Sequence, residues 1–259
     1  MRSLPLRTLL ASVTLLVCPA AVAGTSTSVP AFEARIATAR TATSPGGTTV
    51  IRAEMISALQ VFRGDDGAVD TAEHQYLGTR LGSSAFLTGV TGTAKKYLQD
   101  FYELEDGASV PAPLGSTAVA TPAAQLYGAS GPLASTSVIR EGFIPNGQGV
   151  ANQVTLTNTY YTYFGDAWDD QLWFEPITLR ELTLQLEQNV EGGLPTSDEV
   201  DGALAYITDI SRNSSRLYVA HWHSWGAPGG PGESAGFIVA AVSTDRRFVR
   251  MVNFTRWAE

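Results

Sequence analysis

The chain has 259 residues, of which 16% are charged, and its formal net charge at pH 7 is −8. No cluster of Lys and Arg interrupts this acidic balance, so the composition excludes nucleic acid as a partner and argues against an anionic membrane surface. Calcium, cationic partners and neutral glycans remain compatible with it.

Residues 1–23 have the parts of a signal peptide. Two arginines precede an apolar run from Leu9 to Val17, and Ala21-Val22-Ala23 matches a small-x-small cleavage site. The apolar run is shorter than the roughly 20 residues that span a bilayer. We therefore expect cleavage before Gly24, export to the periplasm or the medium of a bacterial cell, and no membrane insertion afterwards. Cys18 lies in the removed segment, so the mature chain would be free of cysteine and stabilised by its core.

The next part of the chain predicts a small helical bundle. Residues 24–48 are rich in Thr, Ser, Ala and Gly and are expected to form a loose leader. From Thr49, apolar side chains recur at intervals of three and four residues, which indicates a first helix. Two further helices are expected at residues 71–81 and at about 93–103. Residues 49–105 would form the helical domain.

Residues 62–74 (FRGDDGAVDTAEH) join the first two predicted helices. Their second half resembles the closing half of an EF-hand calcium loop, with Gly67 at the turn. The resemblance implies Asp66, Asp70 and Glu73 as calcium ligands.

Two positions of this loop depart from the EF-hand pattern. Ligand positions 1 and 3 fall on Phe62 and Gly64, which offer no side-chain oxygen, so any calcium binding is expected to be weak. The alternative interpretation needs no cofactor: Asp70 is the N-cap of the following helix and Glu73 is its capping-box partner. We favour the cap.

Residues 106–135 are dominated by Pro, Ala, Ser and Gly without a sustained period, and they predict a linker. A long irregular loop within a single domain is the alternative.

Residues 136–259 mix strand and helix patterns. The segment from Val154 to Phe164 is rich in Thr and Tyr and predicts a strand. Capping-box patterns at Thr178 and Thr196 each open a helix. Three strand-like runs follow, at residues 216–225, 236–243 and 248–257, and a short hairpin at 244–247 joins the last two. This order predicts an α+β fold with an antiparallel sheet after the helical bundle.

Two histidines, His221 and His223, share one face of the first of these three strands, because side chains alternate along a strand. This spacing can supply two zinc ligands, with a third from Glu233, Asp245 or His74. Apolar side chains lie on the same face, so the alternative, which we favour, is that the histidines are packed or interface residues.

Ser234 lies in Gly232-Glu-Ser-Ala-Gly236, which has the letters of a G-x-S-x-G nucleophile elbow. Such an elbow needs a strand before the serine and a helix after it, whereas here a Gly/Pro loop precedes and an apolar run follows. The alternative function is therefore a secreted hydrolase that uses His221 and His223 with a metal ion or with Ser234.

Aromatic residues crowd the segment from Tyr160 to Phe174. Tyr160, Tyr163, Trp168 and Trp173 are candidate ligand-binding residues, because such rings stack on sugars and occur at protein interfaces. Packing in the core is the alternative. The sequence predicts an exported, non-enzymatic interaction or ligand-binding protein that recognises a protein or a glycan through this surface and uses no cofactor.

Overall fold

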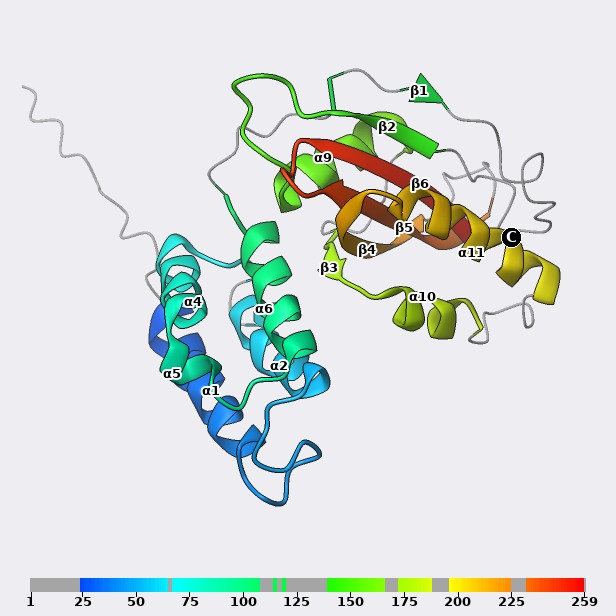
Figure 1. The fold of residues 1–259 in the computed structure, drawn as a ribbon. Helices are drawn as coiled ribbons and strands as arrows, with labels where there is room; N and C mark the ends of the chain where they lie inside the picture. The colour runs from blue at the N-terminus through cyan, green and yellow to red at the C-terminus, as the bar shows by residue number, and fades with distance from the viewer. Residues whose placement is uncertain are drawn as a thin grey trace, which may run out of the picture.

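The computed structural model shows an α+β fold in which helices precede an antiparallel sheet, as predicted (Figure 1). It describes residues 24–64, 67–107, 114–115, 118–119, 139–165, 172–187, 196–224 and 232–258. The predicted signal peptide and most of the predicted linker lie outside these ranges. None of the described helices combines the length and the apolar character that crossing a membrane requires.

The N-terminal part is a bundle of short helices around one apolar core. The helices are α1 (Gly24–Ala39), α2 (Arg52–Leu59), α3 (Val61–Gly64), α4 (Thr71–Gly82), α5 (Ser84–Leu87) and α6 (Gly92–Leu104). The helices predicted at 71–81 and 93–103 are confirmed as α4 and α6. The helix predicted from Thr49 is present but divided into α2 and α3.

Helix α1 corrects the prediction of a loose leader at residues 24–48. Its small polar residues hide a short apolar stripe, since Phe32 and Ile36 lie one turn apart and are 0% and 2% exposed. The ring of Phe32 packs 5.3 Å from that of Phe62 in α3, measured between centroids. Two large apolar side chains on one face suffice for a helix when neighbouring helices cover them.

The C-terminal part is built on one antiparallel sheet with the strand order β1-β2-β6-β5-β4-β3. The strands are β1 (Ala118–Val119), β2 (Ile139–Phe143), β3 (Glu175–Pro176), β4 (Ser214–Ser224), β5 (Ser234–Ser243) and β6 (Phe248–Ala258). The three predicted strands and the hairpin at 244–247 are confirmed as β4, β5 and β6. Strand β2, which was not predicted, pairs with the first half of β6 from Phe143↔Phe248 to Ile139↔Val252.

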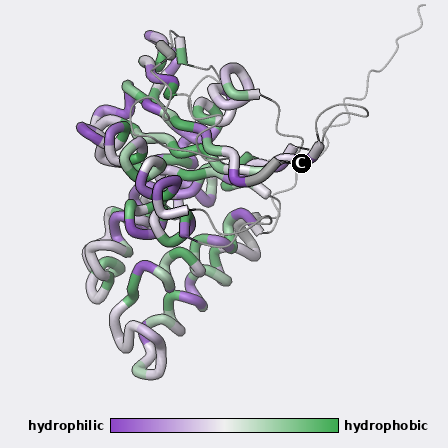
Figure 2. Tube along the Cα trace, turned by 90° about the vertical axis from the view of Figure 1, so that its right-hand side faces the viewer, coloured by the Kyte–Doolittle hydropathy of each residue, from purple (hydrophilic) through white to green (hydrophobic). Residues whose placement is uncertain are grey.

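Both faces of the sheet are covered. Helices α10 (Leu179–Leu186) and α11 (Ser197–Ser211), predicted from their capping boxes, pack on the face that carries Leu217 and Val219. Helix α9 (Gln153–Tyr163) packs on the face that carries Tyr218, Ala220 and Trp222. Figure 2 shows hydrophobic residues along the strands between these layers and inside the bundle.

Helix α9 overturns the strand predicted at residues 154–164. Asn152 caps the helix, because its side-chain oxygen accepts the N–H of Thr155 at 3.0 Å. Leu156 and Tyr160, one turn apart, are buried against the sheet. Thr and Tyr favour strands on average, but burial at helical spacing outweighs that preference here.

Candidate functional site

The helical bundle and the sheet domain meet along a seam of paired charges. Among the described residues, the ion pairs that cross this seam are Arg52–Glu181 (2.7 Å), Arg63–Glu175 (3.3 Å), Arg246–Asp106 (3.5 Å) and Arg216–Glu103. Each domain supplies arginines to carboxylates of the other. The pairs therefore fix the position of the bundle against one end of the sheet.

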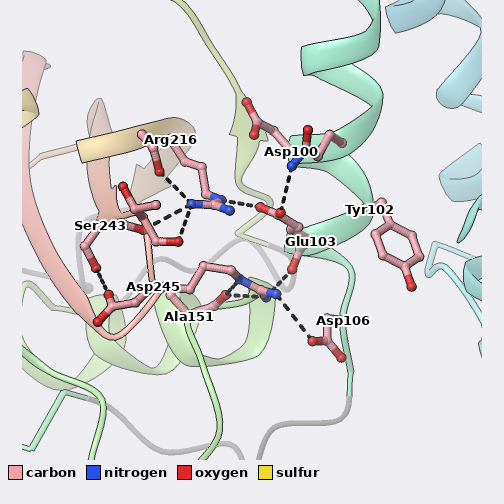
Figure 3. A network of polar contacts seen from close by, with 12 residues as sticks. Asp100, Tyr102, Glu103, Asp106, Ala151, Arg216, Ser243 and Asp245 are labelled. Carbon is pink, nitrogen blue, oxygen red and sulfur yellow. Dashed lines mark hydrogen bonds and ion pairs between the residues drawn. The ribbon is translucent and has the colours of Figure 1, made fainter. Parts of the chain in front are cut away.

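Arg216 of β4 makes the most buried of these contacts, with Glu103 in the last turn of α6 (Figure 3). The two side chains are only 10% and 15% exposed. The guanidinium also donates to the carbonyl oxygens of Ser243 and Thr244, at 3.1 and 3.2 Å. Burial acts to raise the pKa of Glu103, but hydrogen bonds from Arg216 and Gln99 outweigh it and hold that pKa below its usual value. The pair is ionised at neutral pH.

The tip of the β5–β6 hairpin ties to the same end of α6. Arg246 donates to the carbonyl oxygens of Glu103 and Ala151, the latter at 2.7 Å, and pairs with Asp106. The backbone of Arg246 has a φ of 60°, which turns the hairpin sharply. The end of α6 is therefore held by backbone acceptors as well as by charge.

Arg52 of α2 binds Glu181 of α10 in a second pair across the seam, which is bidentate, at 2.7 and 2.8 Å. The guanidinium lies 4.6 Å above the ring of Tyr97. Burial acts to raise the pKa of Glu181, but hydrogen bonds from Arg52 and Thr178 hold it below its usual value. Glu181 therefore caps the N-terminus of α10 and also binds α2 of the bundle through Arg52.

A pocket of about 300 Å³ opens between these pairs, with walls from both domains. The bundle contributes Arg52, Lys96 and Asp100, and the sheet domain contributes Arg216. Lys96 donates to Asp100, whose carboxylate is mostly buried. Burial raises the pKa of Asp100, against the opposing effect of Lys96. Each cation that lines the pocket therefore has a carboxylate partner.

The remaining walls of the seam pocket are uncharged. The hydroxyls of Ser211, Ser214 and Ser215 lie on the sheet-domain side, beside the apolar side chains of Ile177 and Leu217. The Ser215 oxygen accepts from Arg216 at 2.6 Å, which leaves its hydroxyl hydrogen to donate. The pocket therefore presents hydrogen-bond donors and acceptors in fixed positions, and its charged side chains are neutralised in pairs. Such a lining suits the binding of a polar molecule.

The predicted N-cap at Asp70 is confirmed. Its carboxylate accepts the N–H of Glu73 at 2.8 Å, and Glu73 in return accepts the N–H of Asp70 at 3.0 Å. Glu73 is fully buried, and its other oxygen accepts the hydroxyl of Ser28 in α1. Gly67 has a φ of 80°, as a tight turn requires. Asp66 lies outside the described residues, and weak calcium binding stays a prediction.

His221 and His223 lie on β4 and project towards the side of α11. His221 is exposed, and its ring centroid lies 6.3 Å from that of Phe237. Partial desolvation of the imidazole by neighbouring protein atoms lowers its pKa, and the positive charge of Arg256 lowers it further. His223 is 3.8 Å from the carboxylate of Glu233. Within the described ranges, no three His, Cys, Asp or Glu side chains gather closely enough to hold a metal.

The other residues considered for the alternative hydrolase are dispersed. His74 lies in the bundle, where its ring nitrogen is 2.9 Å from the carbonyl oxygen of Tyr102. Asp245 lies in the β5–β6 hairpin, at the other end of β5 from Ser234. Ser234 begins β5 opposite Ser224, and a strand follows it where a nucleophile elbow has a helix.

The residues of the predicted aromatic surface lie in different environments. Tyr160 is only 3% exposed and lies in the core between α9 and the sheet, which corrects its assignment to a recognition surface. Tyr163 is half-buried and donates its hydroxyl to the carbonyl of Leu114 at 2.8 Å. Trp173 is half-buried beneath the guanidinium of Arg63. Trp168 lies outside the described residues.

Comparisons with models of protein families, with curated proteins and with solved structures gave no match for this chain. The seam pocket is therefore identified by its geometry. Sequence reasoning missed it because its charged residues and their partners belong to elements far apart in the chain; Arg52 and Glu181, for example, are 129 positions apart.

Proposed function

We propose that the protein is an exported, non-enzymatic ligand-binding protein, and that its ligand is a neutral, hydroxyl-rich molecule of the glycan class held in the seam pocket. The observation that carries this proposal is the pairing of each cation in the pocket with a carboxylate at the boundary of two domains. Domain boundaries are a preferred location for small-molecule sites. Export rests on the signal-peptide pattern of residues 1–23.

Charge compensation favours a neutral ligand over an ion. Arg52, Lys96 and Arg216 are matched by Glu181, Asp100 and Glu103. An anionic ligand would have to compete with these carboxylates, and a cationic ligand with the arginines. For the mostly buried pair between Arg216 and Glu103, this competition would cost several kcal/mol, because it leaves one charge without its partner. A neutral ligand can instead use the unused hydrogen-bonding capacity of each pair.

The available donors and acceptors match a polyol. The ammonium of Lys96 has three N–H donors and contacts both carboxylate oxygens of Asp100, so at least one donor remains for a ligand. Each of these oxygens has a further lone pair that can accept a hydrogen bond. The hydroxyls of Ser211 and Ser214 already donate to backbone carbonyls and so offer acceptor lone pairs to a sugar hydroxyl, while that of Ser215 can donate. Ile177 and Leu217 offer an apolar wall to the C–H face of a sugar ring. A glycan satisfies both types of surface together.

Calorimetric titration of the chain from Gly24 with a panel of neutral mono- and disaccharides tests the proposal. We expect binding of at least one sugar, and a loss of affinity of about tenfold on Lys96→Met, the change expected when a charged hydrogen bond is removed. Lys95→Met is the matched control, because Lys95 is the exposed neighbour on α6 and does not line the pocket. Inorganic phosphate and citrate should not compete.

Three results would contradict this function. The first is no heat of binding from any sugar at about 10 mM. The second is an equal effect of Lys95→Met and Lys96→Met on the affinity for the sugar that binds. The third is displacement of that sugar by phosphate, which would show that the pocket is selective for anions. Thermal unfolding of both variants confirms that the fold is intact.

A further inference from the structure

A second pocket, of about 380 Å³, is lined by residues of the helical bundle alone. The loop between α1 and α2, which contributes to its walls, lies at the end of the bundle away from the sheet (Figure 1). The walls of the pocket are the second half of α1, the loop that follows, and the first two turns of α2. It shares no lining residue with the seam pocket. We call it the bundle pocket.

The bundle pocket contains one cation and one anion that are not paired with each other. Arg35 of α1 donates through one terminal nitrogen to the carbonyl oxygen of Ser57, and has no carboxylate partner among the described residues. Glu54 of α2 accepts backbone N–H groups from Ile51 at 3.0 Å and Gly46 at 3.4 Å, and likewise has no cationic partner in the described part of the chain. This contrasts with the seam pocket, where every charge is matched.

The loop after α1 holds Glu54 in a fixed orientation. The hydroxyl oxygen of Ser44 lies 2.9 and 2.7 Å from the carbonyl oxygens of Ala39 and Gly47, so its single hydrogen can bond to the loop at either point. Gly46 has no room for a side chain, because a Cβ there would lie 2.1 Å from the oxygen of Thr49 and 2.9 Å from the carboxylate of Glu54. The carboxylate is therefore oriented before any ligand arrives.

Glu54 is ionised at neutral pH. Partial burial acts to raise its pKa, but hydrogen bonds from Ile51, Ser44 and Gly46 outweigh burial and lower the pKa below its usual value. The rest of the lining is uncharged. It includes Thr38 and Thr41, whose positions in the sequence lie between those of Arg35 and Glu54. A ligand must thus offer a negative end to Arg35 and a positive end to Glu54.

We propose that the bundle pocket binds a free α-amino acid as its zwitterion. The ligand carboxylate would bind the unused N–H groups of Arg35, which form a planar fork suited to carboxylates. The ligand ammonium would bind the carboxylate of Glu54, with threonine hydroxyls taking its remaining N–H bonds. A ligand of one sign would satisfy only one of the two charges.

Calorimetric titration of the chain from Gly24 with the twenty common L-amino acids, one at a time, tests this site. We expect at least one to bind, and both its N-acetyl derivative and its carboxamide to bind at least about tenfold more weakly, because each lacks one of the two charges. Arg35→Gln and Glu54→Gln should each weaken binding to a similar extent. Arg180→Gln, a change of another exposed arginine on α10, should leave the affinity unaltered.

Absence of binding by every amino acid at about 10 mM would overturn the inference. So would equal affinity for the amino acid and its N-acetyl derivative, or an unchanged affinity in Arg35→Gln. Lys96→Met should leave amino-acid binding intact, so failure of the bundle pocket and failure of the seam pocket are distinguishable. Glutamine at position 54 can still accept the N–H of Ile51, which keeps the variant folded.

Discussion

Replacement of Arg216 by Met tests whether the seam stabilises the folded protein. The substitution removes the guanidinium and keeps an apolar side chain about as long as the aliphatic stem of arginine. Glu103, whose side chain is 15% exposed, would retain only the weaker hydrogen bond from Gln99 at 3.2 Å and the more distant charge of Arg246. The carbonyl oxygens of Ser243 and Thr244 would also lose a donor.

The expected cost lies between two limits. Breaking a fully buried ion pair costs about 3–5 kcal/mol, and an exposed pair contributes about 0–1 kcal/mol. The pair between Arg216 and Glu103 is mostly buried, but Gln99 still supports the carboxylate, so we expect a loss of about 2–3 kcal/mol in the free energy of unfolding. For a chain of this size, that loss lowers Tm by roughly 4–12 °C.

Urea unfolding, followed by circular dichroism and tryptophan fluorescence, measures this change. Glu103→Gln and the double variant complete a mutant cycle, in which we expect a coupling energy of at least about 1 kcal/mol. A loss below about 0.5 kcal/mol in Arg216→Met, or a coupling energy near zero, would refute the argument that the seam is held by this pair.

The same cycle has a predicted pH dependence. The pKa of Glu103 is lowered in the folded protein, so its contribution to stability is complete above the unfolded-state pKa of about 4.3 and is lost as pH falls through the lower, folded-state value. The difference in unfolding free energy between the wild type and Arg216→Met should therefore be largest at neutral pH and shrink below about pH 4. Asp100 adds to this difference with the same sign, because burial raises the pKa of Asp100 while Arg216 acts to lower it, and the variant loses that effect of Arg216. A difference that grows in acid would contradict the assigned sign.

Two further substitutions test the sheet and the helix cap. In Gly236→Ala, the new Cβ would lie 2.0 Å from the backbone oxygen of Phe254 and 2.4 Å from the ring of Trp222. We therefore expect the free energy of unfolding to fall by about 3 kcal/mol or more. Gly82→Ala is the control, because the space around Gly82 is open, and it should be neutral or slightly stabilising. Asp70→Ala should lower the free energy of unfolding by about 1 kcal/mol because it removes the N-cap of α4, and Asp70→Asn should retain most of that stability. Urea unfolding measures all four variants. Equal losses in Gly236→Ala and Gly82→Ala, or in Asp70→Ala and Asp70→Asn, would contradict the respective mechanism.

The elements that sequence predicted well are those specified by local chemistry. The capping boxes at Thr178 and Thr196 marked the starts of α10 and α11 because each cap joins residues three apart. The strands β4, β5 and β6 were evident because each is a long apolar run bounded by turn residues. In each case the residues that decide the structure are neighbours in the sequence.

The errors arise where distant packing decides the structure. Residues 24–39 are mostly small and polar, yet α1 forms because Phe32 and Ile36 meet the core of the bundle. The Thr- and Tyr-rich segment of α9 is helical because Leu156 and Tyr160 face the sheet together. Propensity is a weak prior beside such burial. No local pattern states which other element will cover a given face.

The candidate site was beyond sequence reasoning for a related reason. A low content of charged residues suggested few candidates for chemistry, but the structure gathers several of them at one seam. Arg52 of the bundle pairs with Glu181 of the sheet domain, and Arg216 of the sheet domain pairs with Glu103 of the bundle. Because the pairs run in both directions, sliding one domain along the other would break pairs of both kinds at once, and each would leave a largely buried charge unpaired. This exchange fixes the walls of the pocket between the pairs, so a ligand there meets donors and acceptors whose geometry is already set, and little of its binding free energy is spent on ordering them.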